Sequence, residues 1–344
     1  MTRFREEIGE QPEVAGRLLM TSREAVAAIA ARVRAERPSG FVIAARGSSD
    51  HAALYAKYLF GSRNRALVSL AAPSLFTHYT RPPRMEGACV IGISQSGASP
   101  DVIAVIEEGH RQGCLTVAIT NAAGSRLAEA ADLVLALDTG PERSVPASKT
   151  YTASLLAMGL LSQAFDPDPE FAAALARVPR ALGAALELDA SLDRLVPALL
   201  GPRAVVLGRG YNLSTAEEVA LKLTETSYVL ARAWSIADFE HGPIAVVDAG
   251  FPVLLVGAAG PVASDLAGIA ERLAGYSCRV VAIVDGYPGP LEAEATVRLN
   301  SGLPEELTPL TLAVLGQLLA HRVAIALKID PDRPRALNKV TRTW

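Results

Sequence analysis

The sequence has few cysteines, few aromatic residues and no block of one charge sign. Its three cysteines, Cys89, Cys114 and Cys278, lie in or beside apolar runs, and an odd number without metal-ligand spacing favours reduced thiols in a cytoplasmic protein. The net charge is −3 without a basic cluster, which argues against nucleic acid as a partner.

The chain also lacks an uninterrupted apolar segment of the kind that spans a membrane. Its start, Met1-Thr-Arg-Phe-Arg-Glu-Glu, is charged and has no apolar signal core. The most apolar window, 244–263, contains Asp248, three Gly and two Pro. We therefore predict two buried strands and a turn there, and no membrane partner.

Apolar residues make up 50% of the 344 residues, and alanine, leucine and valine dominate them. Strand patterns alternate with helical patterns, which predicts an α/β fold with parallel sheets and helices on both faces. The expected strands are 40–45, 66–70, 88–93, 115–120 and 133–137, then 204–208, 252–256, 279–284 and 296–299. Long helices are expected at 148–165 and from about 171 to 199.

Proline and glycine residues interrupt the helix and strand patterns and divide the chain into four predicted parts. We predict N-terminal helices at 1–38, with a break near Gln11-Pro12, a first α/β domain at 39–166, a second with a leading helix at 167–330, and a tail at 331–344. The boundary at 166 rests on Asp166-Pro-Asp-Pro-Glu170.

The second half repeats the first at a nearly constant offset. Arg46-Gly47 recurs as Arg209-Gly210, and Gly97 recurs as Gly260, 163 residues later. Cys114–Ile119 recurs as Cys278–Ile283, and Pro141-Glu142 as Pro304-Glu305. Four matches in register predict a duplicated domain.

One polar loop occurs only in the first copy. Ser94-Gln95-Ser96-Gly97 and Ser99 follow an apolar run and precede a helical pattern that begins at Pro100. Hydroxyls and the first amides of a helix can bind a phosphate, although a simple helix cap explains such a loop equally well. The second copy reads Val256-Gly-Ala-Ala-Gly260 and has no such side chains, which favours phosphate binding in the first.

The stretches that match a known family are the loop Ser94–Gly97, Arg46-Gly-Ser-Ser49, Val145–Lys149, Glu218–Tyr228, Glu240-His-Gly-Pro243 and the C-terminal lysine. In these stretches the chain resembles the SIS (sugar isomerase) family. In particular, the chain is similar over nearly its whole length to the isomerase half of glutamine–fructose-6-phosphate amidotransferase. The resemblance implies two flavodoxin-like or Rossmann-like SIS domains, a sugar-phosphate substrate, and no cofactor or metal.

The resemblance implies a role for each matching position. Phosphate contacts fall on the loop, and sugar contacts fall on neighbouring stretches; together they are Ser94, Gln95, Ser96, Ser99, Ser49, Val145, Ala147 and Lys222. Ala147 stands where the family has a sugar-contacting serine, and Asn338 replaces a small residue before the lysine. Ser48 is better explained as a helix cap.

Three residues are the expected catalytic groups. Glu225, three residues after Lys222 on one helix face, matches the family's enolising base, although such a pair is commonly only an ion pair. His241 matches the residue that aids ring opening from the partner subunit of a homodimer, or else is a structural loop histidine. Lys339 matches the lysine that forms a Schiff base with the ketose, or is solvated surface.

The sequence lacks the family's glutaminase nucleophile, since residue 2 is Thr. We therefore expect the nitrogen-releasing direction, from glucosamine 6-phosphate to fructose 6-phosphate and ammonia. A fructosamine-phosphate deglycase, another sugar-phosphate isomerase and a non-catalytic sugar-phosphate sensor remain as alternatives.

Overall fold

The structure, a computed structural model, describes residues 2–337 and 339, and these form two compact units. The N-copy unit comprises Glu13–Glu142, Lys149–Ala176 and Lys339. The C-copy unit comprises the chain up to Pro12, Arg143–Ser148 and Arg177–Leu337. Of the predicted tail, residues 338 and 340–344 lie outside the described residues.

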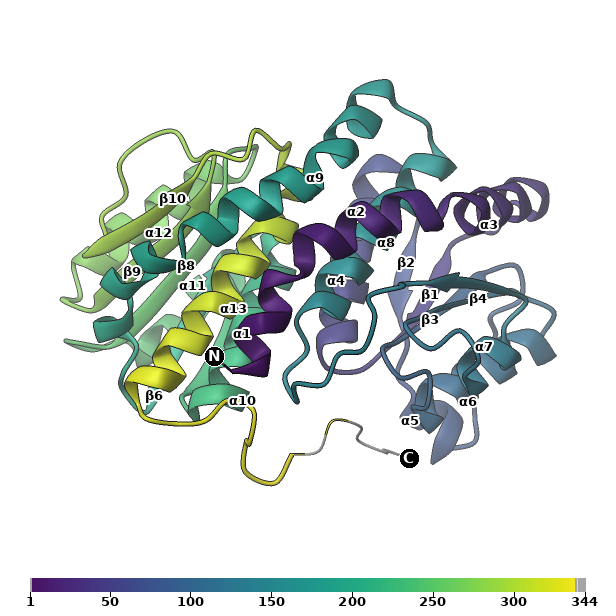
Figure 1. Cartoon of the computed structure of the whole chain (residues 1–344), viewed down its shortest axis with the longest axis horizontal. Helices are drawn as coiled ribbons and strands as arrows, with labels where there is room; N and C mark the ends of the chain where they lie inside the picture. The colour runs from purple at the N-terminus through teal and green to yellow at the C-terminus, as the bar shows by residue number, and fades with distance from the viewer. Residues whose placement is uncertain (1, 338, 340–344) are drawn as a thin grey trace. The chain divides into compact units, whose positions relative to one another are not determined.

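The N-copy unit is built on a parallel sheet of five strands in the order β2-β1-β3-β4-β5 (Figure 1). The strands are β1 (Phe41–Ala44), β2 (Val68–Leu70), β3 (Cys89–Ser94), β4 (Leu115–Thr120) and β5 (Leu133–Ala136). All residues of β3 and β4 are buried, as expected for central strands covered on both faces.

Helices cover both faces of this sheet. On one face α8 contacts both α3 and α4, and on the other α6 contacts α5 and α7. The helices are α3 (Arg23–Glu36), α4 (Ser48–Arg63), α5 (Ser74–Thr77), α6 (Pro100–Arg111), α7 (Arg126–Ala130) and α8 (Lys149–Phe165), while α2 (Gln11–Thr21) begins in the other unit and ends in this one. Helix α9 (Pro169–Glu187) begins in this unit and ends in the other.

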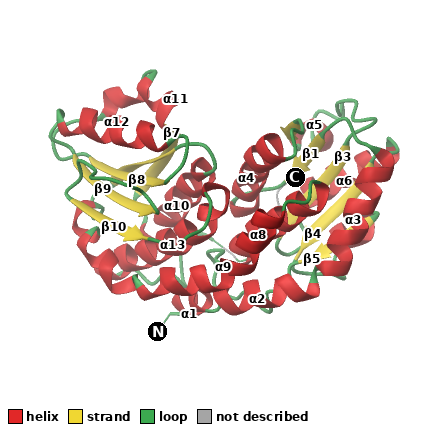
Figure 2. Ribbon diagram, turned by 90° about the horizontal axis from the view of Figure 1, so that it is seen from above, coloured by secondary structure: helices red, strands yellow, loops and turns green. Residues whose placement is uncertain are grey.

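The C-copy unit repeats the plan with the order β10-β9-β8-β6-β7. Figure 2 shows α11 and α12 on one side of its sheet and α10 and α13 on the other. The elements are β6 (Arg203–Gly208), β7 (Leu230–Ser235), β8 (Pro252–Ala258), β9 (Arg279–Asp285), β10 (Ala295–Leu299), α1 (Arg3–Gly9), α10 (Asn212–Ser227), α11 (Ile236–Glu240), α12 (Ala263–Ala274) and α13 (Thr308–Ala326), with short 3₁₀ helices η1 (Asp189–Arg194), η2 (Val196–Ala198), η3 (Pro243–Val246) and η4 (Glu305–Leu307).

Both sheets have the same flavodoxin-like order once they are numbered from their own first strand, so the predicted duplication is confirmed. In each, the chain leaves its first and third strands in opposite directions. Ligands of such sheets bind in the crevice beyond the carboxyl ends of these two strands. The crevice lies at β1 and β3 in the N-copy unit and at β6 and β8 in the C-copy unit.

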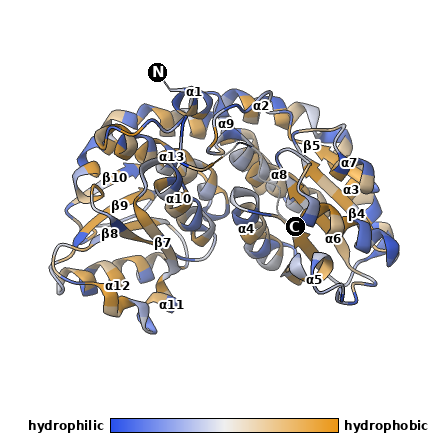
Figure 3. Ribbon diagram, turned by 90° about the horizontal axis from the view of Figure 1, so that it is seen from below, coloured by the Kyte–Doolittle hydropathy of each residue, from blue (hydrophilic) through white to orange (hydrophobic). Residues whose placement is uncertain are grey.

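The cores are aliphatic. Figure 3 shows the strand β4 and the helix α12 in the colours of hydrophobic residues. The segment Glu305–Ala326, which includes α13, is long and apolar enough to cross a membrane, and 78% of its most apolar window is buried inside the protein, as in a core helix.

Three local predictions were wrong. Residues Leu230–Ser235 form the edge strand β7, which the expected strands did not include. No strand forms near Ala245, because Gly242 and Pro243 start the 3₁₀ helix η3 instead, so window 244–263 has one strand. The helix expected at 171–199 ends at Glu187 and continues as two 3₁₀ helices.

Candidate functional site

The polar loop of the N-copy unit connects β3 to α6 at the crevice of the sheet. Gly97 has φ 60°, and its carbonyl accepts a hydrogen bond from the Leu127 amide at 3.1 Å. A Cβ at this position would lie 1.9 Å from Oγ of Ser125. Glycine is therefore required here by both backbone conformation and close packing.

The loop hydroxyls turn toward one another. Ser94 Oγ lies 3.2 Å from Ser99 Oγ, and Ser94 is 5% exposed. Ser99 occupies the N-cap position of α6, but its side chain does not cap the helix, and the Val102 amide is bound by Asp101 instead. Hydroxyls that are not used for capping can donate to an anion, so the simple cap does not explain this loop.

The remaining loop donors are half-buried. Gln95 and Ser96 are both partly exposed, and the Ser96 hydroxyl accepts a long bond of 3.3 Å from the Ala98 amide. Among the described residues, the Gln95 side chain has no hydrogen bond. A polar, partly open loop at the positive end of a twelve-residue helix is suited to a phosphate.

Ser49 lies at the neighbouring strand end. It is the second residue of α4, whose N-cap is Gly47 at φ 55°, and not Ser48 as we expected. An ion pair of 2.5 Å joins Arg46, before this helix, to Asp101 in α6. Because the Asp101 side chain is fully buried, the pair fixes the β1–α4 and β3–α6 loops to each other.

The same crevice in the C-copy unit is occupied by a side chain of the protein. The carboxyl group of Glu305 lies against Gly260: a Cβ there would be 2.0 Å from Oε2. The other oxygen is 3.6 Å from where a Cβ on Gly210 would be. Burial, and then Glu306, raises the pKa of Glu305 to about 7. A carboxyl group that ionises here disfavours a second anion, which gives the asymmetry of the two copies a structural basis.

The Arg–Asp pair, by contrast, is present in both copies. Arg209 contacts Asp265 at 2.9 Å, as Arg46 contacts Asp101, so this pair belongs to the repeated fold. The copies differ in the loop side chains, in the position of Glu305, and in the burial of the pair, because the Asp101 side chain is fully buried whereas that of Asp265 is 39% exposed.

Helix α10 carries a buried ammonium between two carboxylates. Lys222 Nζ lies 2.5 Å from Glu225 Oε2 and 3.4 Å from Glu218 Oε1. The side chains of Lys222 and Glu218 are 1% exposed, whereas that of Glu225 is 24% exposed. Glu225 is thus the most exposed member of the cluster, and it is held by Lys222, which also contacts Glu218.

His241 and the 143–148 segment belong to the same unit as this cluster. His241 is exposed on the turn after α11, and among the described residues no hydrogen bond or ion pair engages its ring. Val145 and Ala147 are half-buried. Their segment is anchored by Glu7, which accepts from the Arg143 and Ser144 amides, and by Gln317, which donates to the Ser148 carbonyl.

Lys339 belongs to the N-copy unit and is paired there. Its Nζ lies 2.7 Å from Oε2 of Glu142, and its side chain is 23% exposed. The Glu142 side chain is fully buried and accepts from the amide and the hydroxyl of Thr150, at 3.0 and 2.8 Å. The lysine is therefore held by a specific partner, and a solvated surface lysine does not describe it.

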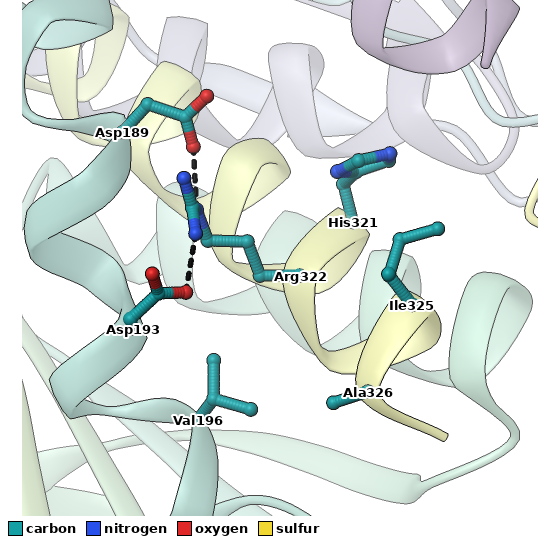
Figure 4. A pocket seen from close by; sticks show the side chains of 7 residues that line it. All are labelled: Asp189, Asp193, Val196, His321, Arg322, Ile325 and Ala326. Atoms are coloured by element: carbon teal, nitrogen blue, oxygen red, sulfur yellow. Dashed lines mark hydrogen bonds and ion pairs between the residues drawn. The ribbon is translucent and has the colours of Figure 1, made fainter. Parts of the chain in front are cut away.

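A separate hollow of about 310 Å³ lies in the C-copy unit beside α13 (Figure 4). The guanidinium of Arg322 pairs there with Asp189 at 2.6 Å and with Asp193. Burial lowers the pKa of His321, the neighbour of Arg322 on α13. Because two carboxylates neutralise the arginine, this pocket is poorly suited to an anionic substrate.

Neither metal nor thiol chemistry has a clear site in the described residues. They contain no group of three or more His, Cys, Asp or Glu side chains that could hold a metal ion. Burial raises the pKa of Cys89 to about 12 and also raises the pKa values of Cys114 and Cys278, which disfavours the thiolate form at neutral pH.

Sequence reasoning missed three participants: Glu142, Glu305 and the Arg46–Asp101 pair. The two glutamates were visible as the repeated Pro-Glu dipeptide, but the repeat gave no sign of what either side chain contacts. The spacing predicted that Lys222 lies near Glu225 or pairs with Glu218, and in the structure Lys222 contacts both.

Comparison with known proteins gives one family. The model of the SIS domain matches residues 39–164 and 201–327. The glutamine–fructose-6-phosphate aminotransferase (isomerizing) of Thermococcus kodakarensis is 30% identical over 343 residues, which cover 97% of this chain and 56% of the relative. The chain thus spans about half the length of the curated relatives it matches.

Two solved structures are similar over their whole length. One is a Silicibacter pomeroyi protein provisionally assigned as a phosphosugar isomerase, with a TM-score of 0.89 and 35% identity over 96% of this chain and 100% of that one. The other is glucosamine-6-phosphate deaminase of Thermotoga maritima, with a TM-score of 0.78 over 99% and 100% of the two chains. At 20% identity, the second likeness concerns the fold alone.

Proposed function

This chain belongs to the SIS domain family, and from that premise we propose that it is an amino-sugar-phosphate isomerase and deaminase. The substrate is glucosamine 6-phosphate, and the products are fructose 6-phosphate and ammonia. The observation that carries the proposal is the hydroxyl-lined loop at the β1/β3 crevice, whose counterpart at β6/β8 is occupied by Glu305.

In this mechanism the phosphate binds to Ser94, Gln95, Ser96 and Ser99, with Ser49 at the neighbouring strand end. Hydroxyl and amide donors suit a phosphate ester, and the N-terminus of α6 adds a favourable dipole. A single phosphate site fixes which end of an open-chain sugar faces the reacting groups. Val145 and Ala147 contact the sugar.

Glu225 moves a proton between C2 and C1, which converts the C2 amine of the aldose into a C2 imine of the ketose. It is suited to this work because it is the exposed member of its cluster and is held by the Lys222 ammonium. His241 assists opening of the sugar ring. Its exposed, unengaged ring in the described chain supports a role across the interface of a homodimer.

Release of nitrogen from the C2 imine is assigned to Lys339, whose amine replaces ammonia in a Schiff base that water then hydrolyses. Because the substrate is a sugar phosphate, we propose that the enzyme acts in the cytoplasm.

The test is an assay panel on the purified protein. We expect ammonia release from glucosamine 6-phosphate, and Glu225→Gln should abolish turnover while leaving substrate binding within about threefold, because the phosphate contacts are intact. Turnover of a fructosamine phosphate alone would replace the proposed reaction by a deglycase. Binding without turnover of any sugar phosphate would indicate a sensor.

A further inference from the structure

None of the roles proposed above uses the contact between Glu142 and Lys339. Lys339 must attack carbon as a neutral amine, so its proton needs an acceptor, and a carboxylate oxygen of Glu142 lies 2.7 Å from its nitrogen. The carboxylate is fully buried, so the contact is not a screened surface pair. The lysine proton must therefore move to a neighbouring group when the amine reacts.

We propose that Glu142 orients Lys339, accepts its proton when the amine reacts, and returns that proton to the nitrogen that leaves. The inference rests on the proposed function, because it concerns the nitrogen-exchange step. Glu142 is suited to the role because its other contacts fix it: the Thr150 amide donates at 3.0 Å and the Thr150 hydroxyl at 2.8 Å. Thr150 is in the first turn of α8, where the helix dipole also favours a negative charge.

The proton balance of the step is complete without another reactant. The Lys339 ammonium gives one proton to Glu142, and the free amine adds to C2 of the neutral imine as the carbon–nitrogen double bond becomes single. A proton shift between the two nitrogens gives a neutral adduct. Glu142 then returns its proton to the departing nitrogen, the C2–NH₃ bond breaks, and ammonia leaves as the lysine nitrogen forms the new protonated C2=N bond.

The duplication of the chain provides a matched comparison. Glu305 stands 163 residues after Glu142 in the second copy and lies against Gly260 instead. Among the described residues its carboxyl group has no cationic partner. The same repeated position therefore holds the tail lysine in one copy and occupies a crevice in the other.

The first measurement is steady-state kinetics on glucosamine 6-phosphate. We expect Glu142→Gln to lower kcat by about 100-fold, as for loss of a proton acceptor, while KM changes by less than about threefold because the phosphate loop is unchanged. Glu142→Asp, which keeps the charge, should recover part of kcat. The control Glu305→Gln should leave both constants within about twofold.

The second measurement is reduction with borohydride in the presence of fructose 6-phosphate, followed by peptide mass analysis. Wild type should gain one sugar adduct on Lys339 and Lys339→Arg none. Glu142→Gln should gain less than about a tenth of the wild-type label. If Glu142→Gln does not fold, Thr150→Val removes only the hydroxyl bond to Glu142 and should show a smaller loss in both measurements.

The outcomes separate the two claims. An equal label on wild type and on Glu142→Gln, or on Thr150→Val in its place, would overturn the role of Glu142 and leave the proposed function intact. Absence of label from wild-type Lys339, beside normal ammonia release, would overturn the Schiff-base step and the inference with it. A loss of label in Glu305→Gln equal to that in Glu142→Gln would show a general structural effect and would also reject the role.

Discussion

Replacing Gly97 by alanine should damage the phosphate loop from within. Alanine at φ 60° is strained by roughly 1 kcal/mol. Its Cβ would lie 1.9 Å from Oγ and 2.4 Å from Cβ of Ser125, so the backbone must move. Overpacking of this kind adds about 1–3 kcal/mol, which gives a total loss of roughly 2–4 kcal/mol in the free energy of unfolding.

The functional effect should be larger than the loss of stability alone suggests. A loop shift of about 1 Å moves Ser96 and Ser99 out of hydrogen-bond range, so KM for the sugar phosphate should rise at least tenfold. The assay is steady-state kinetics beside urea denaturation. Ser125→Gly in the same chain removes the clash but not the strain, and should recover part of the lost stability.

Gly260→Ala is the matched control, because its Cβ also meets a side chain, the carboxyl end of Glu305, at 2.0 Å. That side chain can swing away, and the loop binds no phosphate in this account, so KM should stay within about twofold of wild type. Similar KM effects of the two substitutions, or a normal KM for Gly97→Ala, would refute the assignment of the anion to the first copy.

Two further predictions concern the charged groups. Lys222→Met removes the ammonium between Glu218 and Glu225 and should lower the free energy of unfolding by about 3–5 kcal/mol. The control, Lys57→Met at an exposed position, should lower it by less than about 0.5 kcal/mol. Equal losses in urea denaturation would contradict the buried cluster. Glu305 has a pKa raised from 4.5 to about 7, so the folded state binds more protons than the unfolded state and wild-type stability should fall as pH rises from 4.5 through 7. After allowance for partial exposure, this change in the free energy of unfolding is about 1–2 kcal/mol. Glu305→Gln should remove the change. If the melting temperature of Glu305→Gln depends on pH as that of wild type does, the assignment to Glu305 is refuted.

The repeated fold was predictable because central parallel strands read as apolar runs and helices show a clear period. The edge strand β7 was not, since Leu-Ala-Arg-Ala-Trp-Ser contains few β-branched residues and follows a helix directly. The strand expected near Ala245 failed for the converse reason, because an apolar run does not extend when Gly242 and Pro243 turn the chain.

The site was predictable only where its residues are close in sequence. Ser94–Ser99 and the Lys222–Glu225 spacing reveal a shared loop and a shared helix face. Glu142 and Lys339 are 197 residues apart, so no local pattern could pair them. That Ser99 leaves the helix uncapped, and that Glu305 occupies the second crevice, depend on side-chain positions that only the structure gives.

The location of the bound phosphate tests most directly whether the first copy holds the anion. A crystal soaked with glucosamine 6-phosphate should show the ester group against the Ser94, Ser96 and Ser99 hydroxyls, with the Glu305 carboxyl still beside Gly260. A phosphate seated at Gly257–Gly260, with Glu305 displaced and the Ser94–Ser99 loop empty, would contradict it.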